Sequence, residues 1–152
     1  MGSKKPYDQR SDLEKIRSQW KKISGLLNRK EWSSAIVRAA TAAEIATNFA
    51  VRSEFSKASN IDDYFVDSLL IWANGINGKF KNILIPLHQE KKTKSAYKKL
   101  GDISMKINSI RNSVVHRGAF CNEAESKDAV ENAKIYIETL VNFYEDEIFE
   151  LQ

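Results

Sequence analysis

The sequence predicts an all-α fold, a single-domain, up-and-down bundle of about five helices. Apolar residues recur at steps of three and four along most of the chain, and the alternation typical of strands is nearly absent. The connections between the periodic stretches are short, which favours antiparallel neighbouring helices. We expect residues 1–152 to form one domain, with residues 1–6 and 150–152 fraying at its ends.

The first predicted helix covers the apolar positions between Leu13 and Leu27. Ser11 or Asp12 can cap its first turn, since both side chains accept hydrogen bonds from free backbone N–H groups. Asn28 lies near its end.

The second predicted helix runs from about Glu31 to Phe55. Small side chains dominate one stripe of it, which allows a neighbouring helix to approach closely. We therefore expect this helix at the centre of the bundle, with the stripe formed by Trp32, Ile36, Ala39, Ala43, Ala46 and Ala50.

A third predicted helix begins after a cap at Asn60 or Asp62. Gly75 and Gly78 weaken its middle, so a bend or break is expected near Gly75, and Pro86 helps to end it. The residues expected to face inward are Phe65, Leu69, Trp72, Ile76, Phe80, Ile83 and Leu87.

The fourth and fifth predicted helices follow the polar connection Gln89–Lys94. Gly118 is well placed to stop the fourth, and the fifth begins at about Asn122 or Glu123. The inner face of the fourth comprises Tyr97, Leu100, Ile103, Ile107, Ile110 and Val114. That of the fifth comprises Val130, Ala133, Ile137, Leu140, Tyr144 and Ile148.

Composition excludes several classes of protein. No apolar run approaches the roughly 20 residues that a membrane helix needs, and the first residues lack the apolar core of a secretory signal. Cys121 is the single cysteine, which excludes an internal disulfide and fits a reducing compartment. We therefore expect a cytoplasmic protein with no membrane association.

Standard metal and cofactor motifs are absent from the sequence. His88 and His116 are the only histidines, and neither has a second ligand at metal-binding spacing. The glycines near Gly75 lack the spacing of a phosphate-binding loop. The sequence thus predicts neither a metal site nor a cofactor.

Charge is distributed unevenly along the chain, although the net charge is only +4. Residues 79–117 carry ten Lys or Arg and two acidic residues, whereas residues 118–152 carry two Lys and nine acidic residues. The basic segment could attract a polyanion. Alternatively, the two segments pack as neighbouring helices and neutralise each other.

One stretch gathers chemically versatile side chains, namely Arg111-Asn112-Ser113-Val114-Val115-His116. Asn112 and His116 share a helical face, but Arg111 and His116 lie about 140° apart on an ideal helix. Arg111 and His116 converge only if the helix frays near His116 or if a second copy of the chain completes the site. A guanidinium can bind a phosphate and imidazole can transfer a proton, which metal-free RNA cleavage through the 2′-hydroxyl requires. The alternative is structural, because Arg and His both favour the negative end of a helix.

The same six residues resemble the R-x4-6-H signature of HEPN domains, including the polar residue after the Arg. The late position of the motif and the alanine-rich second helix with Glu44 are also similar. The resemblance implies a metal-independent endoribonuclease that works as a homodimer, with the two motifs facing one another across a shared cleft. By position, His116 would be the acid/base group, Arg111 the phosphate anchor and Asn112 an orienting residue, with Glu44 in a supporting role.

Members of this family often serve as toxins, antiphage effectors or RNA-processing enzymes beside an antitoxin or nucleotidyltransferase partner. Some toxins of the family carry a tyrosine two positions after the His, where this chain has Gly118. Residues expected to hold the RNA backbone are Lys91, Lys92, Lys94, Lys98, Lys99 and Arg117, although such a run is also typical of a solvated face. Two alternatives stay open: a non-catalytic binding or dimerisation module, and a regulatory subunit of a defence or nucleotidyltransferase system.

Overall fold

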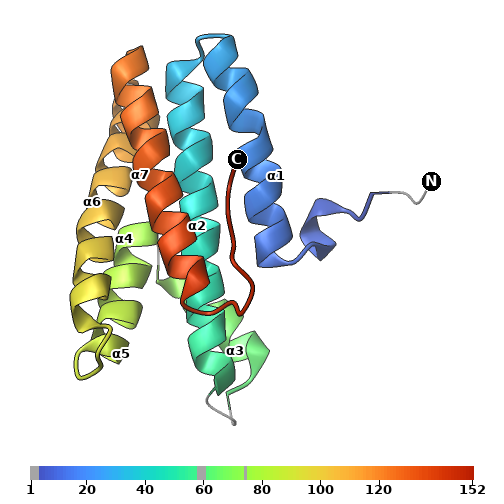
Figure 1. Ribbon diagram of the computed structural model, residues 1–152, viewed down its shortest axis with the longest axis vertical. Helices are drawn as coiled ribbons and strands as arrows, with labels where there is room; N and C mark the ends of the chain where they lie inside the picture. Colours follow the sequence, from blue (N-terminus) through green and yellow to red (C-terminus); the bar gives the residue numbers. More distant parts are fainter. Residues whose placement is uncertain (1–3, 58–60, 74) are drawn as a thin grey trace.

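The computed structural model describes residues 4–57, 61–73 and 75–152, and within them the chain is all-α, with no strand. Four long helices run alternately up and down: α1 (Asp12–Asn28), α2 (Trp32–Lys57), α6 (Lys94–Arg117) and α7 (Glu123–Asn142) (Figure 1). A 3-10 turn, η1 (Tyr7–Gln9), precedes α1. None of the described helices is long and apolar enough to cross a membrane.

Local capping explains where α1 and α7 begin and where α6 ends. Ser11 caps α1 through a reciprocal pair of hydrogen bonds with Glu14, and Asn122 does the same for α7 with Glu125. Gly118 ends α6 in the left-handed conformation at φ 63°, which a glycine adopts without strain. The predicted starts of the first and fifth helices and the end of the fourth are therefore confirmed.

Helix α2 lies at the centre of the bundle, as its small side chains predict (Figure 1). It packs against α1 on one side and α7 on the other, and α6 also contacts it. Its buried stripe is wider than predicted, because packing neighbours on several sides cover more of its surface. The buried alanines are Ala35, Ala39, Ala40, Ala42, Ala43, Ala46 and Ala50.

The third predicted helix is divided into α3 (Asp63–Trp72) and a second helical stretch from Gly75 to His88. Asp62 caps α3, whereas Asn60 lies outside the described residues. Gly75 has φ 77°, so the predicted break occurs at this position. The second stretch comprises α4 (Gly75–Lys79), the π-helical turn η2 (Phe80–Leu84) and α5 (Ile85–His88). Pro86 lies in the first turn of α5, directly after the π-helical turn, where the missing N–H of a proline is tolerated, and α5 ends two residues later at His88.

This break changes which residues of α3 face inward. Val66 and Leu70 are buried, whereas Phe65 and Trp72 are 56% and 83% exposed. The predicted inward positions of Phe65 and Trp72 were therefore wrong, as was that of Leu87, which is 40% exposed. A continuous helix would have kept one phase from Phe65 onward, but the break lets α3 rotate independently of the stretch that follows.

The C-terminal segment packs against the bundle instead of extending α7. Helix α7 ends at Asn142, and Ile148 is exposed rather than part of an inner helical face. Leu151 is buried, and the Trp20 Nε1–H donates to the carbonyl of Gln152 over 3.0 Å. Residues 150–152 are thus held against α1, contrary to the expectation that they fray (Figure 1).

Candidate functional site

The Arg111-to-His116 motif occupies the C-terminal turns of α6, which stays helical through Arg117. Regular helical geometry then separates Arg111 from His116 by about 140° around the axis and about 7.5 Å along it. The helix does not fray at His116, so that route to convergence within one chain is closed. The side chains of Arg111 and His116 therefore lie on different faces of the C-terminal end of α6.

Arg111 continues the core-facing stripe of α6. Leu100, Ser104 and Ile107 are buried, and Arg111 follows Ile107 by one helical turn. The Arg111 side chain is half-buried, and its Nη1–H donates to Oδ1 of Asn112 over 3.3 Å. Among the described residues, no carboxylate forms an ion pair with this guanidinium. A cation on a core-facing stripe without an anionic partner can bind an external anion.

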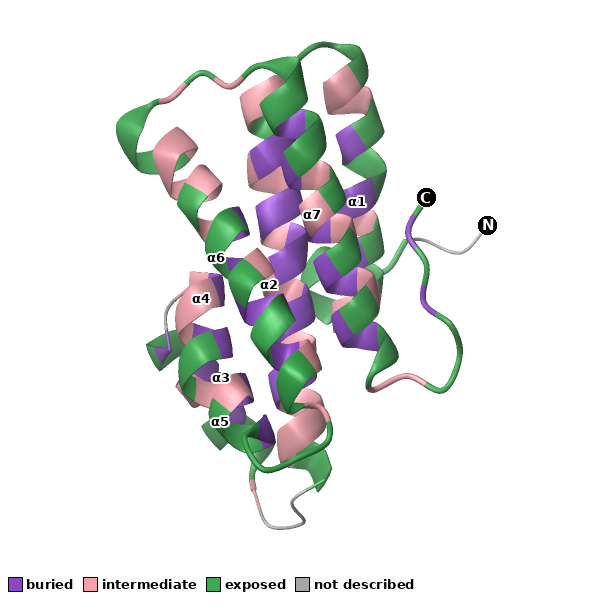
Figure 2. Cartoon of the chain, turned by 60° about the vertical axis from the view of Figure 1, so that its left-hand side comes forward, coloured by how far each residue is buried: buried purple, intermediate pink, exposed green. Residues whose placement is uncertain are grey.

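The end of α6 that carries the motif is only partly covered by the rest of the bundle. None of residues 108–117 is fully buried, in contrast with the first half of the helix (Figure 2). Ile110 and Val114, which were predicted to face inward, are half-buried. Covering such half-buried apolar side chains with a further surface lowers the free energy.

His116 lies on the other side of α6 and is exposed. Ser109 and Ser113 precede it by seven and three residues, so all three share one helical face. Both serines line an open hollow of about 590 Å³ between α6 and the loop before α7. Two exposed apolar side chains, Met105 at 58% and Phe120 at 99% exposure, line the same hollow.

The lysines predicted to bind RNA lie at the opposite end of α6 from the motif. Lys91, Lys92, Lys94, Lys98 and Lys99 are all exposed, and Lys94 precedes His116 by about 33 Å of helix. Arg117 is exposed beside the motif. Only a ligand long enough to span most of α6 can contact the lysines and the motif in one chain together.

Glu44, predicted to support the motif, has a different partner. Its Oε1 accepts from Nζ of Lys79 over 3.0 Å, and the Lys79 side chain is only 6% exposed. The described contacts do not connect Glu44 with Arg111 or His116. The pair joins α2 to α4, and Glu44 therefore acts in packing these two helices.

A second polar cluster, not predicted from the sequence, lies at the other end of the bundle. His88 stacks on Tyr97, its Nε2 lies 2.8 Å from Oε1 of Glu54, and its Nδ1 lies 2.6 Å from Oγ1 of Thr93. Tyr144 donates to Glu54 over 2.7 Å and also contacts the Tyr97 hydroxyl. His88 and Tyr144 lie 34 and 90 residues from Glu54 in the sequence, so no local motif could reveal the cluster.

The environment of this cluster fixes its charge states. Burial lowers the pKa of His88, and its hydrogen bond and attraction to Glu54 offset this only partly. Burial opposes ionisation of Glu54, but the hydrogen bonds from Tyr144 and His88 outweigh it and lower the pKa of this carboxyl. Burial also raises the pKa of Tyr97 and Tyr144, which stay protonated and act as donors.

Comparison with known proteins gives no relative from which a function could be transferred. No family model, no curated protein and no solved structure matches this chain. In the described parts of the chain, no three His, Cys, Asp or Glu side chains are grouped as metal ligands. The functional interpretation therefore depends on the residues themselves.

Proposed function

We propose that this chain is a metal-independent endoribonuclease that acts as a homodimer, with Arg111, His116 and Asn112 at a cleft between two copies. The observation that carries the proposal is the placement of Arg111, a half-buried cation on the core-facing stripe of α6 without an ion-pair partner among the described residues. The resemblance of residues 111–116 to the R-x4-6-H signature adds the expected reaction, which is metal-independent cleavage of RNA. The resemblance also suggests a toxin or antiphage role, with an antitoxin or nucleotidyltransferase as partner.

A second copy resolves the separation of the two key side chains. Because Arg111 and His116 point about 140° apart on α6, one chain cannot direct both at the same phosphate. Two α6 ends that face each other can bring Arg111 of one copy to His116 of its partner. The half-buried Ile110 and Val114 and the exposed Phe120 supply apolar surface for such an interface.

The proposed reaction uses the RNA ribose as nucleophile. His116 accepts the proton of the 2′-hydroxyl, and a water molecule supplies a proton to the leaving 5′-oxygen. The 2′-oxygen attacks the adjacent phosphorus, the bond to the 5′-oxygen breaks, and a 2′,3′-cyclic phosphate remains. Arg111 stabilises the charge that develops on the phosphoryl oxygens, and Asn112 orients Arg111 through the observed hydrogen bond.

Cleavage of an end-labelled single-stranded RNA in EDTA tests the proposal. We expect products with 2′,3′-cyclic phosphate ends and no cleavage of RNA methylated at every 2′-oxygen. Arg111→Ala and His116→Ala should each lower the rate by about 100-fold or more, the usual scale of acid–base and electrostatic contributions. Undiminished cleavage by both variants would contradict the proposed site.

The other histidine and a charge-conserving change provide matched controls. His88→Gln should cleave at the wild-type rate, because His88 lies at the opposite end of the bundle. Arg111→Lys keeps the charge but loses the planar fork, so it should recover only part of the activity. Circular dichroism of each variant shows whether the bundle remains folded.

A non-catalytic helical module is the second candidate function, in the form of a binding or dimerisation domain or a regulatory subunit of a defence or nucleotidyltransferase system. The separate faces of Arg111 and His116 favour it, because each could then bind a different group. It predicts that RNA or partner binding is retained while no cleavage occurs in wild-type protein.

A further inference from the structure

Helix α3 presents an apolar face to solvent that the proposed function does not use. Tyr64, Phe65, Ile71 and Trp72 are 78%, 56%, 80% and 83% exposed. On an ideal helix these four side chains fall within about 120° of each other. A large apolar side chain has a surface of about 150–250 Å², so these four together expose roughly 600 Å². This area is at the upper end of the range for the largest apolar patch on a monomeric protein.

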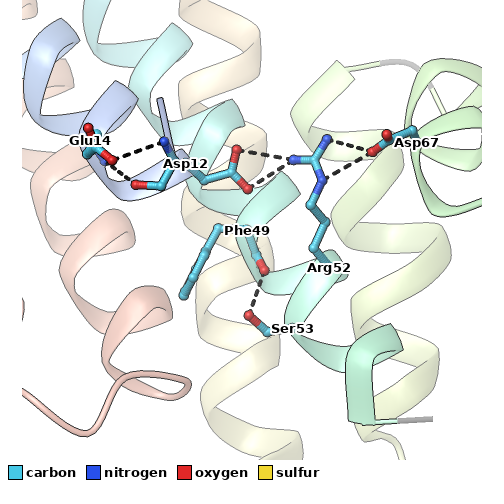
Figure 3. A network of polar contacts seen from close by, with 7 residues as sticks. Asp12, Glu14, Phe49, Arg52, Ser53 and Asp67 are labelled. Atoms are coloured by element: carbon cyan, nitrogen blue, oxygen red, sulfur yellow. Dashed lines mark hydrogen bonds and ion pairs between the residues drawn. The ribbon is translucent and has the colours of Figure 1, made fainter. Parts of the chain in front are cut away.

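The orientation of α3 is fixed by contacts on its other side. Val66 and Leu70 are buried against the bundle. Arg52 on α2 lies between two carboxylates, with Nη2 3.1 Å from Asp67 of α3 and Nη1 2.9 Å from Asp12 of α1 (Figure 3). Turning α3 to bury Trp72 would break the Arg52–Asp67 ion pair and expose Val66 and Leu70. The apolar face is therefore held outward.

Helix α3 and its cap carry only negative charges, although the chain as a whole is basic. Residues 61–78 contain Asp62, Asp63 and Asp67 and no Lys or Arg. Arg52 is shared between Asp67 and Asp12, and Asp63 forms no ion pair with any described residue. A surface that covers α3 must therefore supply apolar side chains and positive charge together.

We propose that the exposed face of α3 docks a helix of another protein that carries apolar residues on one side and Lys or Arg along its flanks. This inference goes beyond the proposed function, because it does not involve the Arg111-to-His116 motif. The ten residues of α3 span about 15 Å, which matches about three turns of a partner helix with anchors at i, i+3 or i+4, and i+7. An area of roughly 600 Å² is below the standard of about 800 Å² per partner and fits a reversible complex.

The same charges oppose other ligands of this face. Carboxylates repel the phosphates of RNA and of anionic lipids. A twofold pairing of α3 with α3 of a second copy would add the same carboxylates to this surface and no positive charge from α3 to offset them. A basic helix is the occupant that gains from both the apolar residues and the carboxylates.

Binding of a designed peptide to the full chain tests the proposal. The probe is a labelled 18-residue helical peptide with Leu on one face and Lys on the other, and its matched control carries Glu in place of every Lys. We expect the Lys peptide to bind with micromolar affinity by fluorescence anisotropy and the Glu peptide to bind at least tenfold more weakly. Equal binding of the two peptides would overturn the charge argument.

Substitutions at exposed positions locate the site without disturbing the core. Ile71→Ser with Trp72→Ser should weaken binding of the Lys peptide at least tenfold. Ile148→Ser is the matched control, because Ile148 and Ile71 are both 80% exposed, and it should leave binding unchanged within twofold. Equal binding by the two variants would place the peptide elsewhere and refute the proposal.

Two further measurements distinguish the other occupants. Sedimentation that shows self-association lost in Ile71→Ser, Trp72→Ser would identify a second copy instead. Flotation with phosphatidylcholine–phosphatidylglycerol vesicles, lost in the same variant, would identify a lipid surface. Either result would overturn the proposal, whereas their absence together with tight Lys-peptide binding supports it. Failure of the RNA cleavage assay would leave this outcome unaffected.

Discussion

His88 and Glu54 show how single residues couple the fold to pH. Their cluster joins α2, α5, α6 and the segment after α7 through side chains that are nearly buried, at 7% and 9% exposure. The hydroxyl of Tyr144 donates a hydrogen bond to Glu54. Because this hydroxyl has only one hydrogen, the hydroxyl of Tyr97 must donate the hydrogen bond between the two tyrosines. Each donor in this series of hydrogen bonds has one acceptor, so the hydrogen bonds hold the cluster in one arrangement.

The lowered pKa of His88 predicts a loss of stability on mild acidification. The lowered pKa means that His88 binds a proton less tightly in the folded chain than in the unfolded chain. The contribution of His88 to the free energy of unfolding is therefore complete above pH 6.5, the ordinary pKa of histidine, and declines as the pH falls below it. The lowered pKa of Glu54 adds a further loss below 4.5. Denaturation by urea at several pH values should show a free energy of unfolding that falls by at most about 1.4 kcal/mol per pH unit for His88.

Two variants separate this contribution from that of the other histidine. His88→Gln keeps a donor for Glu54 but cannot titrate, so the slope between pH 7.5 and pH 5.5 should become shallower. His116→Ala removes the other histidine, so comparison of its slope with that of His88→Gln shows which histidine causes the pH dependence. A wild-type slope in His88→Gln would show that another group titrates in this range.

At the scale of elements, the close packing of α2 depends on its small side chains. Ala43 has no exposed surface, so Ala43→Leu must displace neighbouring helices and should destabilise the bundle by about 1–3 kcal/mol. Ala124→Leu on exposed α7 surface should change stability by less than about 0.5 kcal/mol. Urea denaturation compares the two, and an unaltered stability of Ala43→Leu would argue against close packing at α2.

The four long helices could be predicted because each has a regular apolar period and most of the observed caps and stops are local signals. The caps at Ser11 and Asn122 and the stop at Gly118 are set by side chains within a few residues. Helix α3 could be located but not oriented, since the break at Gly75 removes the phase relation on which the prediction of its inner face depended.

The candidate site was predictable in composition but not in geometry. Spacing alone places Arg111 and His116 about 140° apart, provided that the helix continues to His116. Whether it continues depends on the cap at Gly118, and whether Arg111 is covered depends on how far other helices pack over the end of α6. Similarly, the ion pair of Glu44 with Lys79 crosses 35 residues and could not be found from local sequence.

At the scale of the whole molecule, the proposed site makes a distinction that mixed dimers can test. If each site combines Arg111 of one copy with His116 of its partner, a dimer of Arg111→Ala with His116→Ala contains one intact site and one doubly defective site. Refolding the two inactive variants together in equal amounts forms half of all dimers as mixed pairs, so about a quarter of wild-type RNA cleavage should return.

The double variant Arg111→Ala, His116→Ala sharpens this test. When it pairs with a wild-type chain, both shared sites lack one residue, so refolding with an excess of it should suppress wild-type cleavage. A site contained within one chain would instead keep the activity of every wild-type copy, and the two single variants would not restore cleavage. Because α6 holds Arg111 and His116 on separate faces up to Gly118, we expect restoration and suppression to occur together.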